Sequence, residues 1–173
     1  MENFIYMILN AFHNVAIIGC VAGPFYMARI VKKRSKYEKK IIYEMDRLME
    51  DVITTQPLIC WASLITLVTT GFGFPLIYVL FHGELKEMSI IGIIALGIKL
   101  LAVAGITVIL YVGTFYYNPK LKELFARFQP EQNPDPEIMK QFFAIRALRK
   151  YWCDWCWRFG VLVLIASAIL RWS

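Results

Sequence analysis

The sequence predicts an all-α integral membrane protein, a bundle of four helices that each cross the bilayer. Two observations predict this class: 58% of the 173 residues are hydrophobic while only 18% are charged, and the apolar residues gather in four long runs. Soluble domains are about 45–50% apolar and about 25% charged. An apolar run of about 20 residues, at about 1.5 Å rise per residue, spans the roughly 30 Å hydrocarbon core of a bilayer. The composition therefore excludes a soluble enzyme, a disulfide-rich secreted domain and a nucleic-acid-binding module.

The expected helices follow the apolar runs and make one transmembrane domain over residues 1–173. Backbone amides in hydrocarbon must bond within the segment itself, so runs of this length form helices. In chain order the helices cover about 4–31, 52–81, 88–117 and 152–172. The longer segments between them are the loops 32–51 and 118–151.

Two features modify this simple pattern. Pro24 lies inside the first run, and Pro57 and Pro75 lie inside the second. Each proline removes one helical hydrogen bond and predicts a kink. The segment 137–150, in the second long loop, has a helical composition. We expect this segment to lie along the cytoplasmic interface of the membrane.

Lysine and arginine are concentrated in the two long loops. The loop 32–51 holds seven of them and the loop 118–151 holds another seven, whereas the short loop after the second run holds only Lys86. Basic loops stay on the cytoplasmic side of a membrane, so this bias places both termini on the outer, periplasmic side. The expected location is the cytoplasmic (inner) membrane, crossed several times, with the lipid bilayer as the main partner.

Lys99 and His13 lie deep inside the expected spans. Counted from the outer end at helical rise, Lys99 lies about 16 Å deep and His13 about 14 Å deep. A lysine near a helix centre costs about 2.5–3.5 kcal/mol to insert, so it should face the bundle interior and meet a partner. That partner is water, a bound anionic or carbonyl-bearing ligand, a backbone group, or a hydroxyl group such as those of Thr66, Thr69 and Thr70. Alternatively, the stem of Lys99 snorkels to the interface.

His13 has polar neighbours, Asn10 and Asn14, on the same helix. Neutral imidazole is the usual protein ligand of haem iron, and helical bundles hold cofactors with inward-facing side chains. We therefore expect His13 to bind a metal, with Asn10 and Asn14 as further cofactor-binding residues and Lys99 in the same cavity. The alternative is a core histidine that hydrogen-bonds to Asn10 or to a neighbouring helix. His82 lies at the outer end of the second run, about 14 Å from His13 in depth, so the two do not form a bis-histidine site.

Cys153 and Cys156 form a Cys-x-x-Cys pair at the start of the fourth run. Such a pair is a redox couple or half of a zinc site in other proteins. The sequence holds no second ligand pair that would complete a zinc site. We interpret these thiols as reduced and buried, and Cys20 and Cys60 as small packing residues.

The spacing of residues in the first run is informative. His13 is followed, after nine residues, by Gly-Pro-Phe-Tyr-Met-Ala-Arg, which ends at Arg29. This stretch resembles the first span of the HemJ-type protoporphyrinogen oxidases, in the superfamily that also includes CopD-like proteins. The segment Ile98–Leu101, with Lys99, is similar to the lysine-containing third span of that family. The chain departs from the family pattern near the end of the third run, which lacks a histidine, and before the fourth, which lacks Asn-Glu-x-Pro.

The resemblance implies a divergent member of this family, a four-helix membrane bundle that binds haem b through His13. It also implies that Lys99 and Arg29 are catalytic positions. The family oxidises protoporphyrinogen to protoporphyrin. The expected activity is therefore that of a haem-dependent oxidoreductase, which passes electrons to a quinone or to a respiratory-complex partner.

Two other functions stay open. The chain fits a non-catalytic subunit of a larger respiratory or electron-transfer complex, or a homo-oligomer, because Gly92, Gly97 and Gly105 on the third run permit close helix contact. It also fits a CopD-like copper-transport protein, since copper favours Met, Cys and His ligands. Met7 and His13, six residues apart on one helix, do not share a face. The sequence alone does not decide whether the chain is an enzyme.

Overall fold

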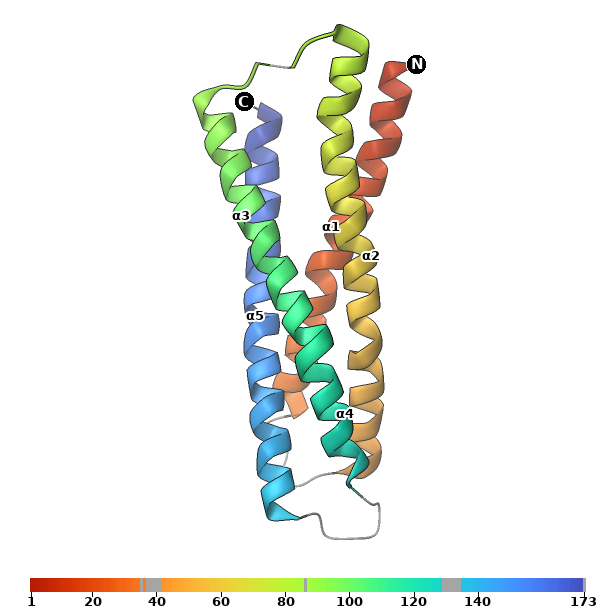
Figure 1. The fold of residues 1–173 in the computed structure, drawn as a ribbon, viewed down its shortest axis with the longest axis vertical. Helices are drawn as coiled ribbons and strands as arrows, with labels where there is room; N and C mark the ends of the chain where they lie inside the picture. Colours follow the sequence, from red (N-terminus) through yellow and green to blue (C-terminus); the bar gives the residue numbers. More distant parts are fainter. Residues whose placement is uncertain (35, 37–41, 86, 129–134, 173) are drawn as a thin grey trace.

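The computed structural model describes residues 1–34, 36, 42–85, 87–128 and 135–172, and every regular element within them is a helix. In chain order these elements are α1 (Glu2–Arg34), α2 (Tyr43–His82), α3 (Ile90–Val112), the π-helix η1 (Gly113–Tyr117), α4 (Asn118–Ala126) and α5 (Pro136–Trp172). The elements α3, η1 and α4 follow one another without a break and form one rod (Figure 1). The described residues therefore fold into four helical rods.

All four rods of the described chain are long and apolar enough to cross a membrane. This confirms the all-α class and the four membrane-length helices that the apolar runs predict. Figure 1 shows both termini at the same end of the bundle, as four crossings require. This end is called the terminal end below, and the opposite end, beside the two Lys- and Arg-rich loops, is called the basic end.

Two of the rods extend well beyond the apolar runs that predict them. α2 begins at Tyr43 and α5 begins at Pro136, each several turns before its apolar run. The composition of the segment 137–150 predicts a helix that lies along the interface. In the structure this segment is instead continuous with the fourth span. The physical reason is that no glycine or proline lies between Pro136 and Gly160, so nothing in the backbone ends the helix.

An apolar cluster holds the early part of α5 against α4. Phe142 and Leu121 are fully buried, and Leu124 and Phe128 pack with them. The rings of Phe128 and Phe142 meet edge to face, with centroids 5.5 Å apart. Since burying a large apolar side chain contributes about 1.5–3 kcal/mol, this cluster stabilises the bundle beyond its apolar spans.

Glycines set how closely α1 approaches its neighbours. α1 packs mainly on α2 and α5, and α3 packs mainly on α5. The Gln56 side chain of α2 occupies the space that a Cβ on Gly23 of α1 would need. Val21 of α1 does the same opposite Gly160 of α5. Small residues at such contacts let helix backbones come close together in a membrane.

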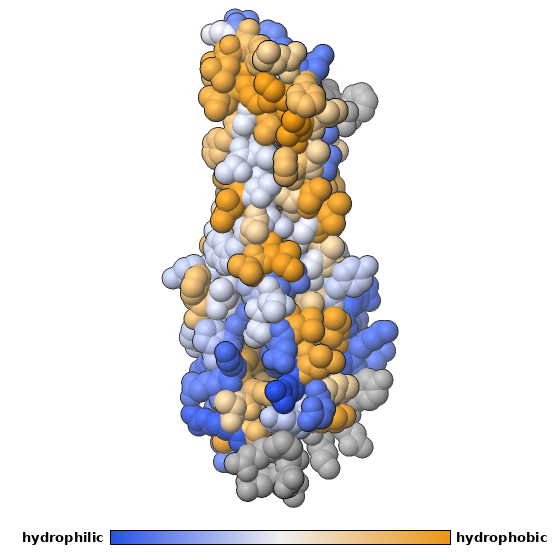
Figure 2. Space-filling model, turned by 90° about the vertical axis from the view of Figure 1, so that its right-hand side faces the viewer, coloured by the Kyte–Doolittle hydropathy of each residue, from blue (hydrophilic) through white to orange (hydrophobic). Residues whose placement is uncertain are grey.

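The surface divides into an apolar part and a charged part. Figure 2 shows apolar residues over the upper part of the bundle, and hydrophilic residues gathering toward the basic end. Large apolar side chains such as Leu58, Phe72 and Leu101 are more than half exposed. Contiguous exposed apolar surface is stable against lipid and unstable against water, so the surface agrees with a membrane location for the upper part.

Candidate functional site

His13 is buried in the half of the bundle toward the terminal end, with 7% of its surface exposed. Its Nδ1 lies 2.7 Å from the hydroxyl oxygen of Thr70 on α2. The Thr70 hydroxyl lies 2.6 Å from the backbone carbonyl of Thr66 and donates its single proton there. We therefore infer that Thr70 accepts the hydrogen bond from His13 Nδ1–H, which leaves the imidazole lone pair on Nε2.

Aromatic packing fixes the plane of the imidazole. Phe74 of α2 meets the His13 ring edge to face, with centroids 5.6 Å apart, and Tyr6 of α1 stacks on Phe74. Within the described residues, Nε2 of His13 forms no hydrogen bond. A metal-binding histidine commonly donates its other ring N–H to a protein acceptor, which sets its tautomer and orientation. The His13 ring thus has the orientation and the free electron pair that a metal ligand needs.

The two asparagines beside His13 do not hold its ring. Asn10 and Asn14 are both exposed on α1, and the partner of the imidazole is Thr70 of the neighbouring helix. Of the alternatives that the sequence leaves open for a structural histidine, the structure shows the interhelical bond and not the bond to Asn10. The asparagine side chains therefore take no part in orienting the imidazole.

A half-buried serine of α5, Ser167, is expected at the level of Asn14. α1 and α5 run antiparallel and meet where Val21 packs on Gly160. Asn14 precedes Val21 by seven residues and Ser167 follows Gly160 by seven. Each is therefore about two turns from the contact, toward the terminal end and on the same face of its helix. The hydroxyl oxygen of Ser167 is buried and has no hydrogen-bond partner in the part of the chain that the structure describes. The sequence analysis missed Ser167, although a lone hydroxyl in an apolar run is a usable signal.

Lys99 lies on the inward side of α3, one turn from the buried residues Ala95 and Ala102. Its side chain is partly buried, and its charge lies near enough to act on the His13 imidazole. No hydrogen bond or ion pair reaches its ammonium from any described residue. The structure therefore brings Lys99 and His13 into one region of the bundle and leaves the lysine without a protein partner there.

The threonines of α2 are not the partners expected for Lys99. The hydroxyls of Thr66, Thr69 and Thr70 all donate to backbone carbonyls of their own helix. Thr70 in addition accepts from His13, so it orients the imidazole. The ammonium of Lys99 remains available for an anionic group of a ligand, because pairing offsets the cost of burying both charges.

Arg29 and His82 lie apart from this region. Arg29 is exposed, and its guanidinium covers the ring of Phe25, 5.1 Å from the centroid. At helical rise Arg29 is about 24 Å along α1 from His13, so the two do not share a site. His82 is at the terminal end, where its Nε2 lies 3.0 Å from a carboxylate oxygen of Glu2.

A multi-ligand metal centre is absent from the described residues. No group of three or more His, Cys, Asp or Glu side chains there is placed to hold a metal ion. The four cysteines are free thiols, and three of them are buried. Haem needs fewer protein ligands, because the porphyrin supplies most of the iron coordination.

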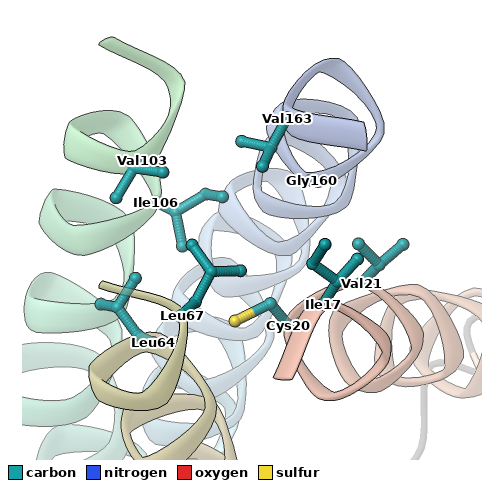
Figure 3. Close-up of a pocket in the computed structure, with 9 residues that line it drawn as sticks. All are labelled: Ile17, Cys20, Val21, Leu64, Leu67, Val103, Ile106, Gly160 and Val163. Carbon is teal, nitrogen blue, oxygen red and sulfur yellow. The ribbon is translucent and has the colours of Figure 1, made fainter. Parts of the chain in front are cut away.

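The middle of the bundle is closed. Figure 3 shows apolar side chains from all four rods meeting around a cavity of about 10 Å³. This is about the space of one water, and the lining has no polar group to hold it. A dry core therefore separates the His13 region from the basic end. The lining residues are Ile17, Cys20, Val21, Leu64, Leu67, Val103, Ile106, Gly160 and Val163.

Asp46, at the start of α2, is fully buried among arginines. Its carboxylate accepts two bonds from Arg34 of α1, at 2.9 and 2.7 Å, and one from Arg146 of α5, at 2.7 Å. The backbone N–H of Ile42 adds a fourth bond at 3.1 Å. Bidentate guanidinium–carboxylate pairs are strong and directional, so Asp46 ties three helices together.

Glu50, one turn further along α2, extends this cluster. Its Oε1 lies 2.9 Å from Arg149 Nη2 and 3.3 Å from Arg146 Nε, both on α5. Arg34, Asp46, Glu50, Arg146 and Arg149 are together called the ion-pair network below. The distribution of basic residues does not predict this pairing. The available signal is the spacing of the two acids, which are four residues apart and so lie on one helix face.

These features define the class of protein: a multi-pass α-helical membrane protein with an oriented histidine in one half and a buried ion-pair network at the other end. No protein-family model, curated protein or solved structure matches the chain. Its function is therefore argued from its own residues.

Proposed function

We propose that the chain is a membrane haem protein that resembles the HemJ-type protoporphyrinogen oxidases and binds haem b through His13. The observation that carries the proposal is the bond from His13 Nδ1–H to Thr70, because it leaves the Nε2 electron pair free. The ring is also buried and held in one orientation, as a haem ligand requires. Bound haem would supply one-electron redox chemistry.

The residues around His13 have separate roles in this proposal. Lys99 pairs with a propionate, because an unpaired ammonium in apolar surroundings is stabilised by an anion. Ser167, Asn10 and Asn14 donate or accept hydrogen bonds at the polar edge of the ligand. His82 is engaged with Glu2 at the terminal end, so His13 is the histidine ligand that the proposal uses.

We also propose that the basic end faces the cytoplasm and that the membrane is the inner membrane, on the basis of the loop charges. Arg29 then lies toward the cytoplasmic side, exposed, where it suits an anionic substrate group or a lipid phosphate. Single cysteines placed at Glu84 and at Lys122 test the orientation with a membrane-impermeant thiol reagent. We expect label at position 84 in intact cells; label at 122 instead reverses the orientation.

An absorption spectrum of the detergent-purified protein, with and without dithionite, tests the haem proposal. We expect a Soret band with α and β bands that respond to reduction. His13→Ala should remove stoichiometric haem while the protein still inserts and purifies as a folded bundle. His82→Ala is the matched control and should keep the spectrum. Full haem content in His13→Ala, or no haem in the parent protein, contradicts the proposal.

A non-catalytic subunit is the second candidate function. Gly97 favours it, because a Cβ at this position of α3 meets no other atom within 4 Å and the site is exposed. Such a small residue on a lipid-facing helix permits close contact with another membrane helix, from a second copy or from a respiratory complex. The spectrum together with a protoporphyrinogen oxidation assay separates the two: haem without turnover supports the subunit.

A further inference from the structure

A second cavity, of about 70 Å³, lies in the half of the bundle toward the basic end. Residues of all four rods line it, and its wall is almost entirely apolar. The amides of Gln56 and Asn118, the hydroxyl of Thr114 and the guanidinium of Arg149 are its main polar groups, and no acid is among the described lining residues. A cavity needs a volume of roughly 10–15 Å³ to hold one water, so this cavity has room for several water-sized groups.

Arg149 is the charged residue on the wall. Its side chain is 5% exposed, its Nη2 lies 2.9 Å from Glu50 Oε1, and its Nη1 donates to Asn118 Oδ1 at 3.3 Å. Its Nε–H forms no hydrogen bond within the described residues. The same Glu50 oxygen also lies 3.3 Å from Arg146, so one carboxylate oxygen serves two guanidinium groups. Arg149 therefore brings an N–H group without a protein partner to the wall, and it shares its carboxylate with a second guanidinium.

The other polar groups of the wall offer mainly donors. Asn118 accepts from Arg149 with its side-chain oxygen, and its side-chain N–H groups form no hydrogen bond within the described residues. The Gln56 amide makes only a long contact, 3.6 Å, to the Cys60 sulfur. The Thr114 hydroxyl is already engaged as donor and as acceptor. A wall with free donors and no acid suits a ligand that brings oxygen acceptors.

Two α-helices contribute a proline to the cavity wall and the third rod contributes a π-helical turn. Pro24 of α1 and Pro57 of α2 line it, and each removes one helical hydrogen bond. Gly113, the first residue of the π-helix η1, lines it from the third rod. Irregular backbone within a membrane is tolerated where it lines a cavity, and π-helical turns occur often at functional sites. This convergence indicates a binding cavity rather than a packing defect.

We propose that this cavity binds the carboxylate end of a membrane-resident amphipathic acid, with the carboxylate on Arg149. The apolar wall accommodates methylene groups, and the guanidinium matches a carboxylate in charge and geometry. Arg149 lies just before the apolar part of α5 begins, where the head of a lipid-like acid is found, while Cys153 and Cys156 line the cavity further into the span. The proposal is independent of haem at His13, because the dry core lies between the two sites.

A single carboxylate fits better than a phosphate. A phosphate monoester brings up to two negative charges, and burying both requires more cations than the one guanidinium on this wall. A neutral alcohol fits less well, because it adds no negative charge where the Glu50 carboxylate is shared by two guanidinium groups. Ligands that share an alkyl chain but differ in head group should therefore bind with different affinities.

Equilibrium binding of radiolabelled palmitate to the purified full-length protein tests the proposal. We expect Gly113→Leu to weaken binding by about tenfold or more, because the new side chain fills the cavity and meets no atom within 4 Å at its Cβ. Gly97→Leu is the matched control, since Gly97 is equally open but lines no part of this cavity. Arg149→Gln should weaken binding similarly, and Arg158→Gln should not, because Arg158 is on the same helix but is not among the residues that line the cavity.

Competition identifies the head group. We expect hexadecanol, hexadecyl phosphate and acetate each to displace palmitate at least about tenfold less well than unlabelled palmitate. Equal displacement by hexadecanol, tighter binding of the phosphate, or unchanged palmitate binding in Gly113→Leu overturns the proposal. Efficient displacement by acetate shows a free-anion site instead of a lipid site. The haem spectrum of Gly113→Leu should be unchanged, so failure here is distinct from failure of the haem proposal.

Discussion

Asp46 and His13, which lie in opposite halves of the bundle, differ in how completely their polar atoms are paired. At the basic end, Asp46 accepts four hydrogen bonds, and its arginine partners come from two other helices. In the half toward the terminal end, His13 has one hydrogen bond, and Lys99 and Ser167 have none within the described residues. Buried polar groups normally find partners, so saturated groups indicate a structural clamp and unsaturated ones indicate room for a ligand. The following predictions test this contrast.

Breaking the ion-pair network should have the largest effect on stability. Asp46→Ala removes the carboxylate that the buried guanidinium groups of Arg34 and Arg146 share, and we expect a loss of about 3–5 kcal/mol in the free energy of unfolding. Denaturation of the protein in detergent micelles measures it. The control is Glu123→Ala, which removes an exposed pair with Arg127 and should cost about 0.3–0.5 kcal/mol. Equal losses in the two variants would show that the network is not a clamp.

A methyl group between α1 and α5 should have the next largest effect. In Gly160→Ala the new Cβ comes 2.6 Å from Val21 Cγ2, so the two helices must move apart, at a cost of about 1–3 kcal/mol. Gly97→Ala adds the same atom in open space and should not destabilise the protein. The same unfolding measurement applies. If both variants are as stable as the parent, close approach at Gly160 does not set the position of α1.

Removing the acceptor of His13 should have a smaller effect on stability and a larger one on binding. We expect Thr70→Val to cost about 1 kcal/mol of unfolding free energy and to weaken haem binding by about 10–100-fold. Thr70→Ser should restore both. Thr69→Val is the control, because that hydroxyl bonds only to its own helix. Haem titration followed by absorbance measures the binding; an unchanged affinity in Thr70→Val contradicts the assigned tautomer.

Lys99→Met should have the smallest effect on stability. The lysine has no protein partner among the described residues, so removing its charge should leave the unfolding free energy unchanged or raise it. Haem affinity or turnover should nevertheless fall, because the propionate loses its cation. Lys122→Met, at an exposed position of α4, controls for loss of a positive charge. A variant that is destabilised but binds haem fully would show that Lys99 is structural.

Part of the candidate site is visible in the sequence. His13 and Lys99 stand out because charged or titratable residues are costly inside apolar runs, and the structure places them in the same region. The sequence also predicts that Asn10, Asn14 and Arg29 belong to the site, but the structure does not bring them to the His13 ring. The asparagines are exposed, and Arg29 lies far along α1. Sequence depth along a helix gives the level of a side chain but not the direction in which it points.

The sequence does not predict which residues pair with His13 and Asp46. Thr70 is 57 residues from His13, and Arg146 is 100 residues from Asp46. Such pairs depend on how each helix is rotated about its axis, which is set by contacts such as Gly23 with Gln56. An arginine in a basic loop looks the same in sequence whether it faces water or a buried carboxylate.

The sequence by itself determined that the chain forms four membrane-length helices, because hydrophobic length and internal backbone bonding are local properties of each segment. It also determined which few polar residues enter the apolar region. Only the tertiary structure decided that α2 and α5 continue past their apolar runs, that an ion-pair network closes the basic end, and that His13 is held by Thr70. These depend on the rotation and spacing of whole helices, which arise from packing between segments far apart in the chain.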